Sequence, residues 1–411
     1  MRKNLRKPAS LLLAALCAGS MLLCACNKTE ETTETTIWEA PTAVETTTEA
    51  PIETTIRNAK DYTHYEKITL DGVKDNYFVS TDYCYLESEK YVLLIDKDIK
   101  IPGDFAVVLD AVIDEIENQT GLSAVPENRE YPNICDSSGY YNGFNPWKDW
   151  NVGSKIPIFL VCDREPKGWI SCASSDDVVI VSYDMFSDEL WNSVPAYRDN
   201  PWRRDGYLDY TEIIHELTHT VTQRNVPMSK IMTEGIAEYM SVSVLNALAG
   251  KYPSLAEVKA KKNSDDNYVP EKVNSSNAEA IFVSDYKDVS HADRGAEYTF
   301  GKYLFMYLNE QSGNEFFKKI TDKLIESGIN YHYDEYDEAS MQKIAGIFKE
   351  LYGDDVFEKF GEWCVKNNHL QKYEKQTPSF LRAFLTHIPQ DPFYLFGLLG
   401  EWIKIGHFGR S

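Results

Sequence analysis

The sequence predicts an α+β protein with an N-terminal lobe built on a mixed β-sheet and a mainly helical C-terminal lobe. Between residues 89 and 182, short apolar runs alternate with an amphipathic segment, which is the pattern of a sheet packed against helices. Beyond residue 295 the pattern is mainly helical. Residues 59–411 are enough for one large domain or two closely packed lobes.

The first predicted elements alternate between strand and helix. The run 89–96 reads as a strand, and 104–120 reads as an amphipathic helix that Gly121 ends. Apolar runs at 156–162 and 177–182 predict two further strands. These elements supply the sheet against which the next helix can bury its apolar face.

Residues 209–221 predict that next helix. Asp209, followed three residues later by Glu212, resembles a capping box at its start, and the stretch 225–227 closes the segment with a proline. Four residues form an apolar stripe along one face: Ile213, Ile214, Leu217 and Val221. A helix with such a stripe packs on the body of a domain.

The other face of this helix carries the motif His-Glu-x-x-His. His215 and His219 are four residues apart, so both imidazoles lie on one side of the helix and can bind a single metal ion. Glu216 lies beside that ion. In this motif the two histidines hold zinc and the glutamate acts as general base on a zinc-bound water.

A second helical pattern follows, from residue 232 to a stop at Gly250, and it carries two carboxylates on one face. Glu234 and Glu238 would both be costly to bury beside the first helix without a cation or a hydrogen bond. A catalytic zinc usually takes three protein ligands and keeps a fourth position open. One of these glutamates therefore completes the predicted site.

The two helices together resemble the gluzincin metallopeptidases, which include thermolysin, zinc aminopeptidases and bacterial collagenases. In that family His-Glu-x-x-His is followed by a helix carrying Glu-Gly-x-Ala-Glu-Tyr, found here from Glu234 to Tyr239. The resemblance implies that Glu234 is the third zinc ligand and that Glu238 orients His215. Because the gap between His219 and Glu234 is short, a swap of roles between the two glutamates stays open.

A further stretch resembles the aminopeptidase branch of the family. There a Tyr-x-x-Gly opens a helix, and its tyrosine donates a hydrogen bond to the oxyanion of the tetrahedral intermediate. Tyr298, followed by Gly301, matches this pattern. The chain is rich in tyrosine, so a packing role for Tyr298 is the alternative. The Gly-x-Met-x-Asn signature that anchors aminopeptidase substrates is absent from the sequence.

The resemblance implies a zincin-like, thermolysin-like catalytic domain and a division of the chain. Its lobes would be 59–225, with the strands and the His-Glu-x-x-His helix, and 226–375, with the third ligand. In a zincin one edge strand pairs with extended substrate, and 177–182 is the candidate for it. A buried central strand is equally consistent with the apolar sequence of 177–182. The clearest helical segments beyond it are 298–311, 314–326 and 339–352.

The N-terminus is typical of an exported bacterial lipoprotein. A basic stretch precedes a short apolar run, which is too short for an ordinary membrane-spanning helix. Leu23-Cys24-Ala25-Cys26 resembles a lipobox, so residues 1–25 would be the signal peptide and Cys26 would carry a lipid. An ordinary secretory signal with incidental cysteines is the alternative. We expect the protein at the bacterial cell surface, lipid-anchored to the outer face of the membrane.

Two segments flank the predicted domain. Residues 26–58 are dominated by Thr, Glu, Pro and Ala, and such a segment cannot bury enough surface to offset its chain entropy. It would form a disordered tether. Residues 376–411 form a C-terminal tail whose apolar run is too short to cross a membrane.

Charge and cysteine content limit the partners. The formal net charge is −22, and removal of the four basic residues of the signal would make it about −26, so nucleic acid is not an expected partner. Five cysteines lie beyond Cys26, and an odd number forbids complete pairing. We expect a monomer that meets a protein or peptide substrate.

The expected function is that of a surface-anchored zinc metallopeptidase, an endopeptidase with one Zn²⁺ ion. Two alternatives stay open. One is a lipoprotein that keeps the gluzincin fold as a binding module, and the other is a zinc hydrolase of a non-peptide amide or ester. Retention of Glu216 favours an enzyme, because a binding module has no use for a general base.

Overall fold

The computed structural model describes residues 55–69, 82–126, 154–162, 172–173, 178–180, 185–198, 210–262, 273–287, 295–331 and 336–367. The chain divides into two units, Met1–Thr46 and Thr47–Ser411, and every described residue lies in the second. The predicted signal peptide, Cys26 and the tail 376–411 lie outside the described residues. Among the described helices, none is long and apolar enough to cross a membrane.

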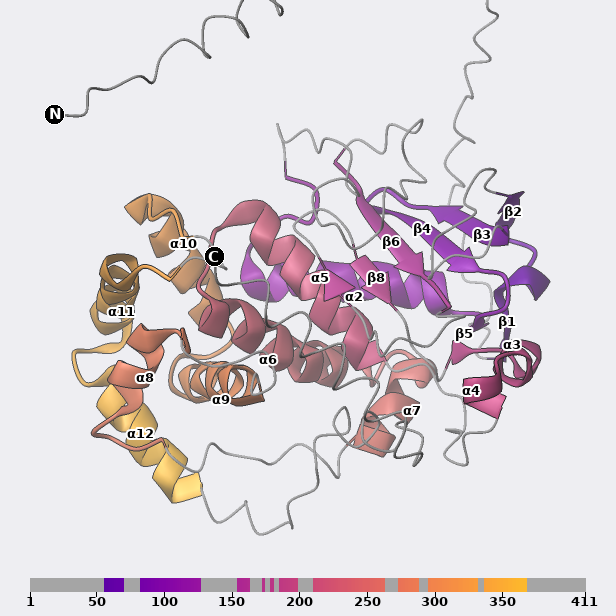
Figure 1. The fold of residues 1–411 in the computed structure, drawn as a ribbon. Coiled ribbons are helices and arrows are strands. Elements are labelled where there is room, and N and C mark those ends of the chain that lie inside the picture. The colour runs from indigo at the N-terminus through magenta and orange to yellow at the C-terminus, as the bar shows by residue number, and fades with distance from the viewer. Residues whose placement is uncertain are drawn as a thin grey trace, which may run out of the picture. The chain divides into compact units, whose positions relative to one another are not determined.

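The described strands form a six-stranded mixed sheet and a two-stranded sheet (Figure 1). The order in the larger sheet is β2 (Glu66–Thr69), β3 (Asp82–Glu87), β4 (Tyr91–Asp96), β6 (Ile156–Leu160), β8 (Val178–Ile180) and β7 (Cys172–Ala173). The first three strands are antiparallel, β4, β6 and β8 run parallel, and β7 returns antiparallel to β8.

The centre of the sheet explains its continuous apolar sequence. Every residue of β4 and β6 is buried, as is typical of parallel strands covered on both faces. The strands predicted at 89–96, 156–162 and 177–182 are confirmed as β4, β6 and β8. The prediction that 177–182 forms the edge is wrong, because β8 pairs with β6 on one side and β7 on the other. The edge belongs to β7, which is too short to show a strand pattern in the sequence.

The two-stranded sheet pairs β1 (Ile56–Asn58) with β5 (Lys100–Pro102), and the short 3-10 helix η1 (Ala59–Asp61) follows β1. The Tyr62 hydroxyl donates to the carbonyl of Ile101 at 2.6 Å, which holds this segment on the domain. Strand β1 lies inside the segment 26–58 for which a disordered tether is predicted. Ordered structure therefore begins before residue 59, because the backbone there finds a partner strand that composition does not reveal.

Helix α2 (Phe105–Thr120) confirms the helix predicted at 104–120. It ends where expected, because Gly121 adopts a left-handed conformation, with φ of 71°, and its N–H donates to the carbonyl of Glu117. Helix α2 contacts α5 (Tyr210–Asn225) and α6 (Lys230–Leu248), the two helices of the predicted metal site, and most of its apolar side chains are buried. Two short helices, α3 (Asp188–Ser193) and α4 (Pro195–Arg198), precede α5.

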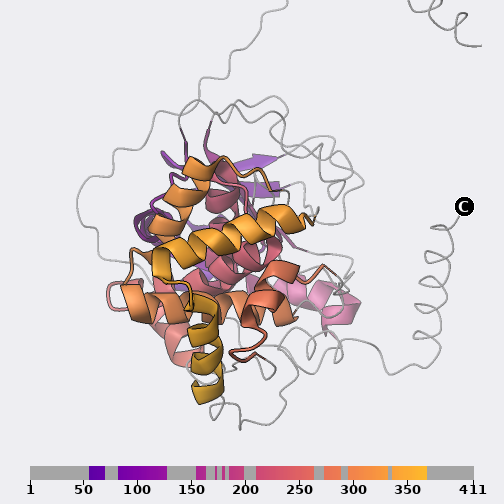
Figure 2. The ribbon, with the colours of Figure 1, turned by 90° about the vertical axis from the view of Figure 1, so that its left-hand side faces the viewer.

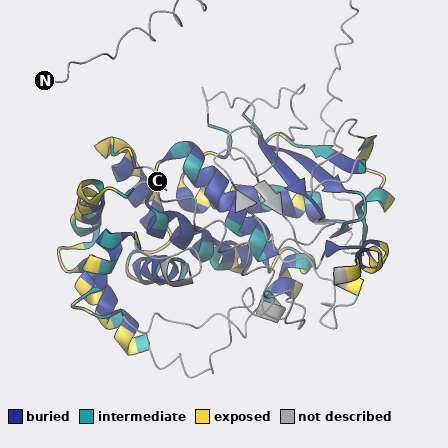
Figure 3. Cartoon of the chain, in the orientation of Figure 1, coloured by how far each residue is buried: buried dark blue, intermediate teal, exposed yellow. Residues whose placement is uncertain are grey.

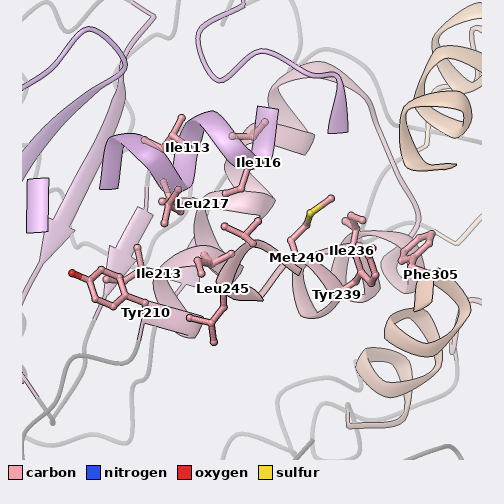
Figure 4. Packing of buried hydrophobic residues seen from close by; sticks show 14 of the residues in the cluster. Ile113, Ile116, Tyr210, Ile213, Leu217, Ile236, Tyr239, Met240, Leu245 and Phe305 are labelled. Atoms are coloured by element: carbon pink, nitrogen blue, oxygen red, sulfur yellow. The ribbon is translucent and has the colours of Figure 1, made fainter. Parts of the chain in front are cut away.

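The packing of α5 explains why its histidines face α6. All four residues of the predicted apolar stripe, Ile213, Ile214, Leu217 and Val221, are fully buried. Figure 4 shows Ile213 and Leu217 in one cluster with Ile113 and Ile116 of α2 and with Leu245 of α6. In Figure 3 both helices are mainly dark blue, so the site lies on buried elements.

The rest of the described chain is helical (Figure 2). Its elements are α7 (Pro253–Lys262), α8 (Ala278–Ser284), α9 (Gly295–Ser312), α10 (Phe316–Ser327), α11 (Glu338–Tyr352) and α12 (Val356–Asn367). The segments predicted at 298–311, 314–326 and 339–352 are confirmed as α9, α10 and α11. Helix α9 packs along α6, and α10 contacts both α9 and α2, so helices from both predicted lobes share contacts.

Candidate metal centre

Helices α5 and α6 bring together three side chains that could hold a metal ion: His215, His219 and Glu234. The two Nε2 atoms of the histidines lie 3.0 Å apart. The Oε2 atom of Glu234 is 3.6 Å from Nε2 of His215 and 3.2 Å from Nε2 of His219. Two histidines four positions apart and a glutamate fifteen positions beyond the second histidine therefore present two nitrogens and one oxygen to a single point.

This donor set fits zinc. With zinc–ligand bonds of about 2.0–2.1 Å, two ligands of a tetrahedral site lie about 3.3 Å apart, which is close to the three separations above. Two imidazoles and one carboxylate are also the ligands of a catalytic site that keeps a fourth position open. His219 and Glu234 are only 6% and 5% exposed, so few water molecules reach these atoms.

Glu238 lies on the other side of His215. Its Oε1 atom is 3.3 Å from Nδ1 of His215, and its side chain is 34% exposed. A carboxylate at Nδ1 favours the tautomer that carries the proton there, which leaves the lone pair of Nε2 for a metal. In this arrangement Glu234, rather than Glu238, faces the two Nε2 atoms. This geometry is the one expected with Glu234 as the metal ligand and Glu238 as the residue that orients His215, rather than the reverse.

The buried carboxylates of the site favour a positive charge beside them. Burial lowers the pKa of His215, but the carboxylates of Glu234 and Glu238 outweigh it and hold the pKa well above its ordinary value. Burial raises the pKa of Glu234, but His219 and His215 outweigh it and hold this pKa well below its usual range. Buried carboxylates need a cation in this way. A divalent ion at the point of convergence would meet the same need with neutral imidazoles.

Glu216 is buried at the same place, with 8% of its surface exposed. Burial raises its pKa, while the charges of His215 and His219 act in the opposite direction. A carboxylate with a raised pKa is better suited to accept and return a proton than an exposed one. Glu216 is not among the three converging donors, which leaves it available for proton transfer.

Tyr298 of α9 completes the group. Its ring stacks on that of His215, with centroids 5.9 Å apart and an angle of 14° between the planes. Even if Tyr298 only packs, the residue that it packs against is His215 of the candidate site. The ring of Tyr298 therefore lies next to one of the three converging side chains.

A pair of glycines allows α9 to come so close. A Cβ atom added at Gly235 would lie 2.4 Å from the Cα of Gly301, and one added at Gly301 would lie 2.3 Å from the carbonyl oxygen of Ile231. Real side chains do not make such contacts with backbone, so only glycine fits at either position. Helices α6 and α9 therefore touch at Gly235, which directly follows Glu234, and at Gly301, which lies three residues after Tyr298.

Contacts at the helix ends position α5 and α6. At the start of α6, Asp285 accepts from the backbone N–H groups of Lys230 and Ile231 at 3.0 and 2.8 Å. At the end of α5, the guanidinium of Arg224 donates to the carbonyls of Ala124 and Ser154. Sequence reasoning missed both residues because their partners lie 54 to 100 positions away.

Sequence reasoning also missed Lys302, whose Nζ atom lies 4.0 Å from Oε2 of Glu238. One signal could have revealed it. Lys302 is a charged residue within the apolar stretch of α9, four positions after Tyr298 and hence on the same face of the helix. The predicted cap residue Asp209 and the lipidation site Cys26 lie outside the described residues.

No family model, no curated protein and no solved structure matches this chain.

Proposed function

We propose that this protein is a zinc-dependent metallopeptidase of the gluzincin type, with a zincin-like fold, that hydrolyses peptide bonds of extracellular proteins or peptides. One observation carries the proposal. Two imidazole nitrogens and the carboxylate of Glu234 converge at zinc-like spacing, with the buried carboxylate of Glu216 on the same helix as the histidines.

In the proposed reaction each residue has one task. When bound, zinc would polarise a water molecule and the substrate carbonyl, so that a nucleophile is available at neutral pH. Glu216 accepts the proton of the attacking water and passes it to the leaving amine. Glu238 holds His215 through Nδ1, and Tyr298 donates a hydrogen bond to the developing oxyanion.

The sheet offers a place for extended substrate. Among the described strands, β7 is the last of the six-stranded sheet beyond β8, and both β7 and β8 contact α5. An edge strand next to a metal helix can pair with a peptide by β-addition, which would present a peptide bond to the site. This supports a polypeptide substrate over a small ester or amide. Anchoring through Cys26 stays part of the proposal and would place the site at the cell surface.

The function is tested with a soluble protein that starts at residue 47, which retains the whole second unit. We expect it to cleave members of a diverse peptide mixture, as read by mass spectrometry. Removal of zinc with a chelator should abolish the products, and stoichiometric zinc should restore them. Full zinc occupancy without any cleavage would contradict the general-peptidase proposal and favour a binding role.

The role of Tyr298 is tested by Tyr298→Phe, which removes only the hydroxyl. If that hydroxyl stabilises the oxyanion, kcat/KM should fall about 10²–10³-fold while zinc content stays unchanged. Tyr307→Phe is the matched control, because Tyr307 lies on the same helix but packs against Phe360 and Trp363. A Tyr298→Phe variant as active as the Tyr307→Phe variant would return Tyr298 to a packing role.

A further inference from the structure

Lys302 is a buried lysine close to the proposed metal centre. It lies on α9 and is 8% exposed, whereas an ordinary surface lysine keeps its ammonium in water. Its Nζ atom is 4.0 Å from Oε2 of Glu238, and the other oxygen of that carboxylate, Oε1, is 3.3 Å from Nδ1 of His215. The two oxygens of Glu238 thus face a lysine on one side and an imidazole on the other.

We propose that Lys302 is a positioning residue for zinc binding, which acts through Glu238 on His215. This inference rests on the proposed zinc site. An ammonium beside one oxygen and an imidazole at the other favour one orientation of the Glu238 carboxylate, and that orientation directs Nε2 of His215 at the metal. Lys302 touches neither the metal nor the substrate in this scheme, and its effect should pass through Glu238.

The fold supports this role through the position of α9. Gly301, the residue before Lys302, lies in backbone contact with Gly235 of α6, which fixes the depth of α9 at this point. Tyr298 lies one turn earlier on the same face and stacks on the ring of His215. One helix face therefore supports His215 twice, by a ring contact at Tyr298 and through Glu238 at Lys302.

The test measures zinc affinity by competition with a chelator of known affinity, so it does not depend on activity. Lys302→Met keeps the apolar stem and removes the charge, and it should weaken zinc binding about 10–100-fold. Lys302→Arg keeps the charge, so its zinc affinity should stay within about threefold of that of the original protein. Lys323→Met is the control, because Lys323 pairs with exposed Glu326 and Glu350 on the surface, and it should change nothing.

A double-mutant cycle with Glu238→Gln identifies the route of the effect. If Lys302 acts through Glu238, Lys302→Met should change affinity by less than about twofold in the Glu238→Gln background. An equal loss in both backgrounds would overturn the proposal, as would unchanged affinity of the single variant. Far-UV circular dichroism shows whether Lys302→Met folds. If it does not, Lys302→Gln takes its place in the cycle, and failure of Lys302→Arg to restore affinity also overturns the proposal. Absence of zinc binding by the original protein would instead refute the proposed function.

Discussion

The Glu216→Gln variant should bind zinc as the original protein does and lose about 10²–10⁴-fold in kcat/KM. Glutamine has the same size and shape as glutamate but cannot accept a proton, so the general base is removed while the helix keeps its packing. Glu216 is buried and is not one of the three converging donors, so the metal should stay in place. The amide also removes a buried charge, so the variant should fold at least as well.

The measurement combines two readouts on the same protein. Mass spectrometry follows cleavage of a peptide mixture, and elemental analysis follows bound zinc. Glu326→Gln serves as a matched control, because Glu326 is exposed on α10 and forms a surface ion pair with Lys323. Cleavage retained to within tenfold would show that another group accepts the proton. Loss of zinc together with activity would instead make Glu216 a ligand.

Local sequence patterns predicted the elements that carry the site. The apolar stripe from Ile213 to Val221 predicts α5 and its buried face, because residues on one face of a helix recur every three or four positions. Gly121 predicted the end of α2, because glycine accepts the left-handed conformation that a helix end requires. The spacing of His215 and His219 predicted that their nitrogens meet, as they do at 3.0 Å. These features depend on neighbours within about one helical turn.

Features that depend on distant residues escaped prediction. The cap that Asp285 provides for α6 joins residues 54 and 55 positions apart, and nothing near Asp285 in the sequence indicates its partner. Strand β7 has two residues, too few for a periodic pattern, so the sequence does not reveal it beside β8 and does not decide whether 177–182 is an edge or a central strand. The pairing of Lys302 with Glu238 depends on how α9 crosses α6, which is set by the contact of two glycines.

The roles of Glu234 and Glu238 depend partly on local sequence and partly on distant residues. The helical spacing places both carboxylates on one face of α6, so the sequence predicts that both reach the histidines. It does not predict the offset between α5 and α6 along their axes. That offset brings Glu234 to the Nε2 atoms and Glu238 to Nδ1 of His215. The two roles should therefore differ in their contribution to metal binding.

Glu234→Gln should consequently reduce zinc affinity far more than Glu238→Gln. Structural zinc sites with four ligands bind with roughly 10–16 kcal/mol, which is about 2.5–4 kcal/mol for each ligand and corresponds to a loss of roughly 10²–10³-fold. Loss of a group that orients a ligand costs about 10–100-fold. The first variant should therefore lose its zinc during dialysis against a weak chelator, while the second keeps most of it.

Competition for zinc by a chelator of known affinity gives both values on one scale. His219→Ala is the reference for the loss of a ligand, because Nε2 of His219 lies 3.2 Å from Oε2 of Glu234 in the same donor set. The Glu234→Gln value should fall near that reference and the Glu238→Gln value should lie between it and the original protein. A reversed order would mean that Glu238 is the ligand. It would also mean that α6 is displaced relative to α5 when zinc binds, because the present geometry directs Glu238 at Nδ1 of His215.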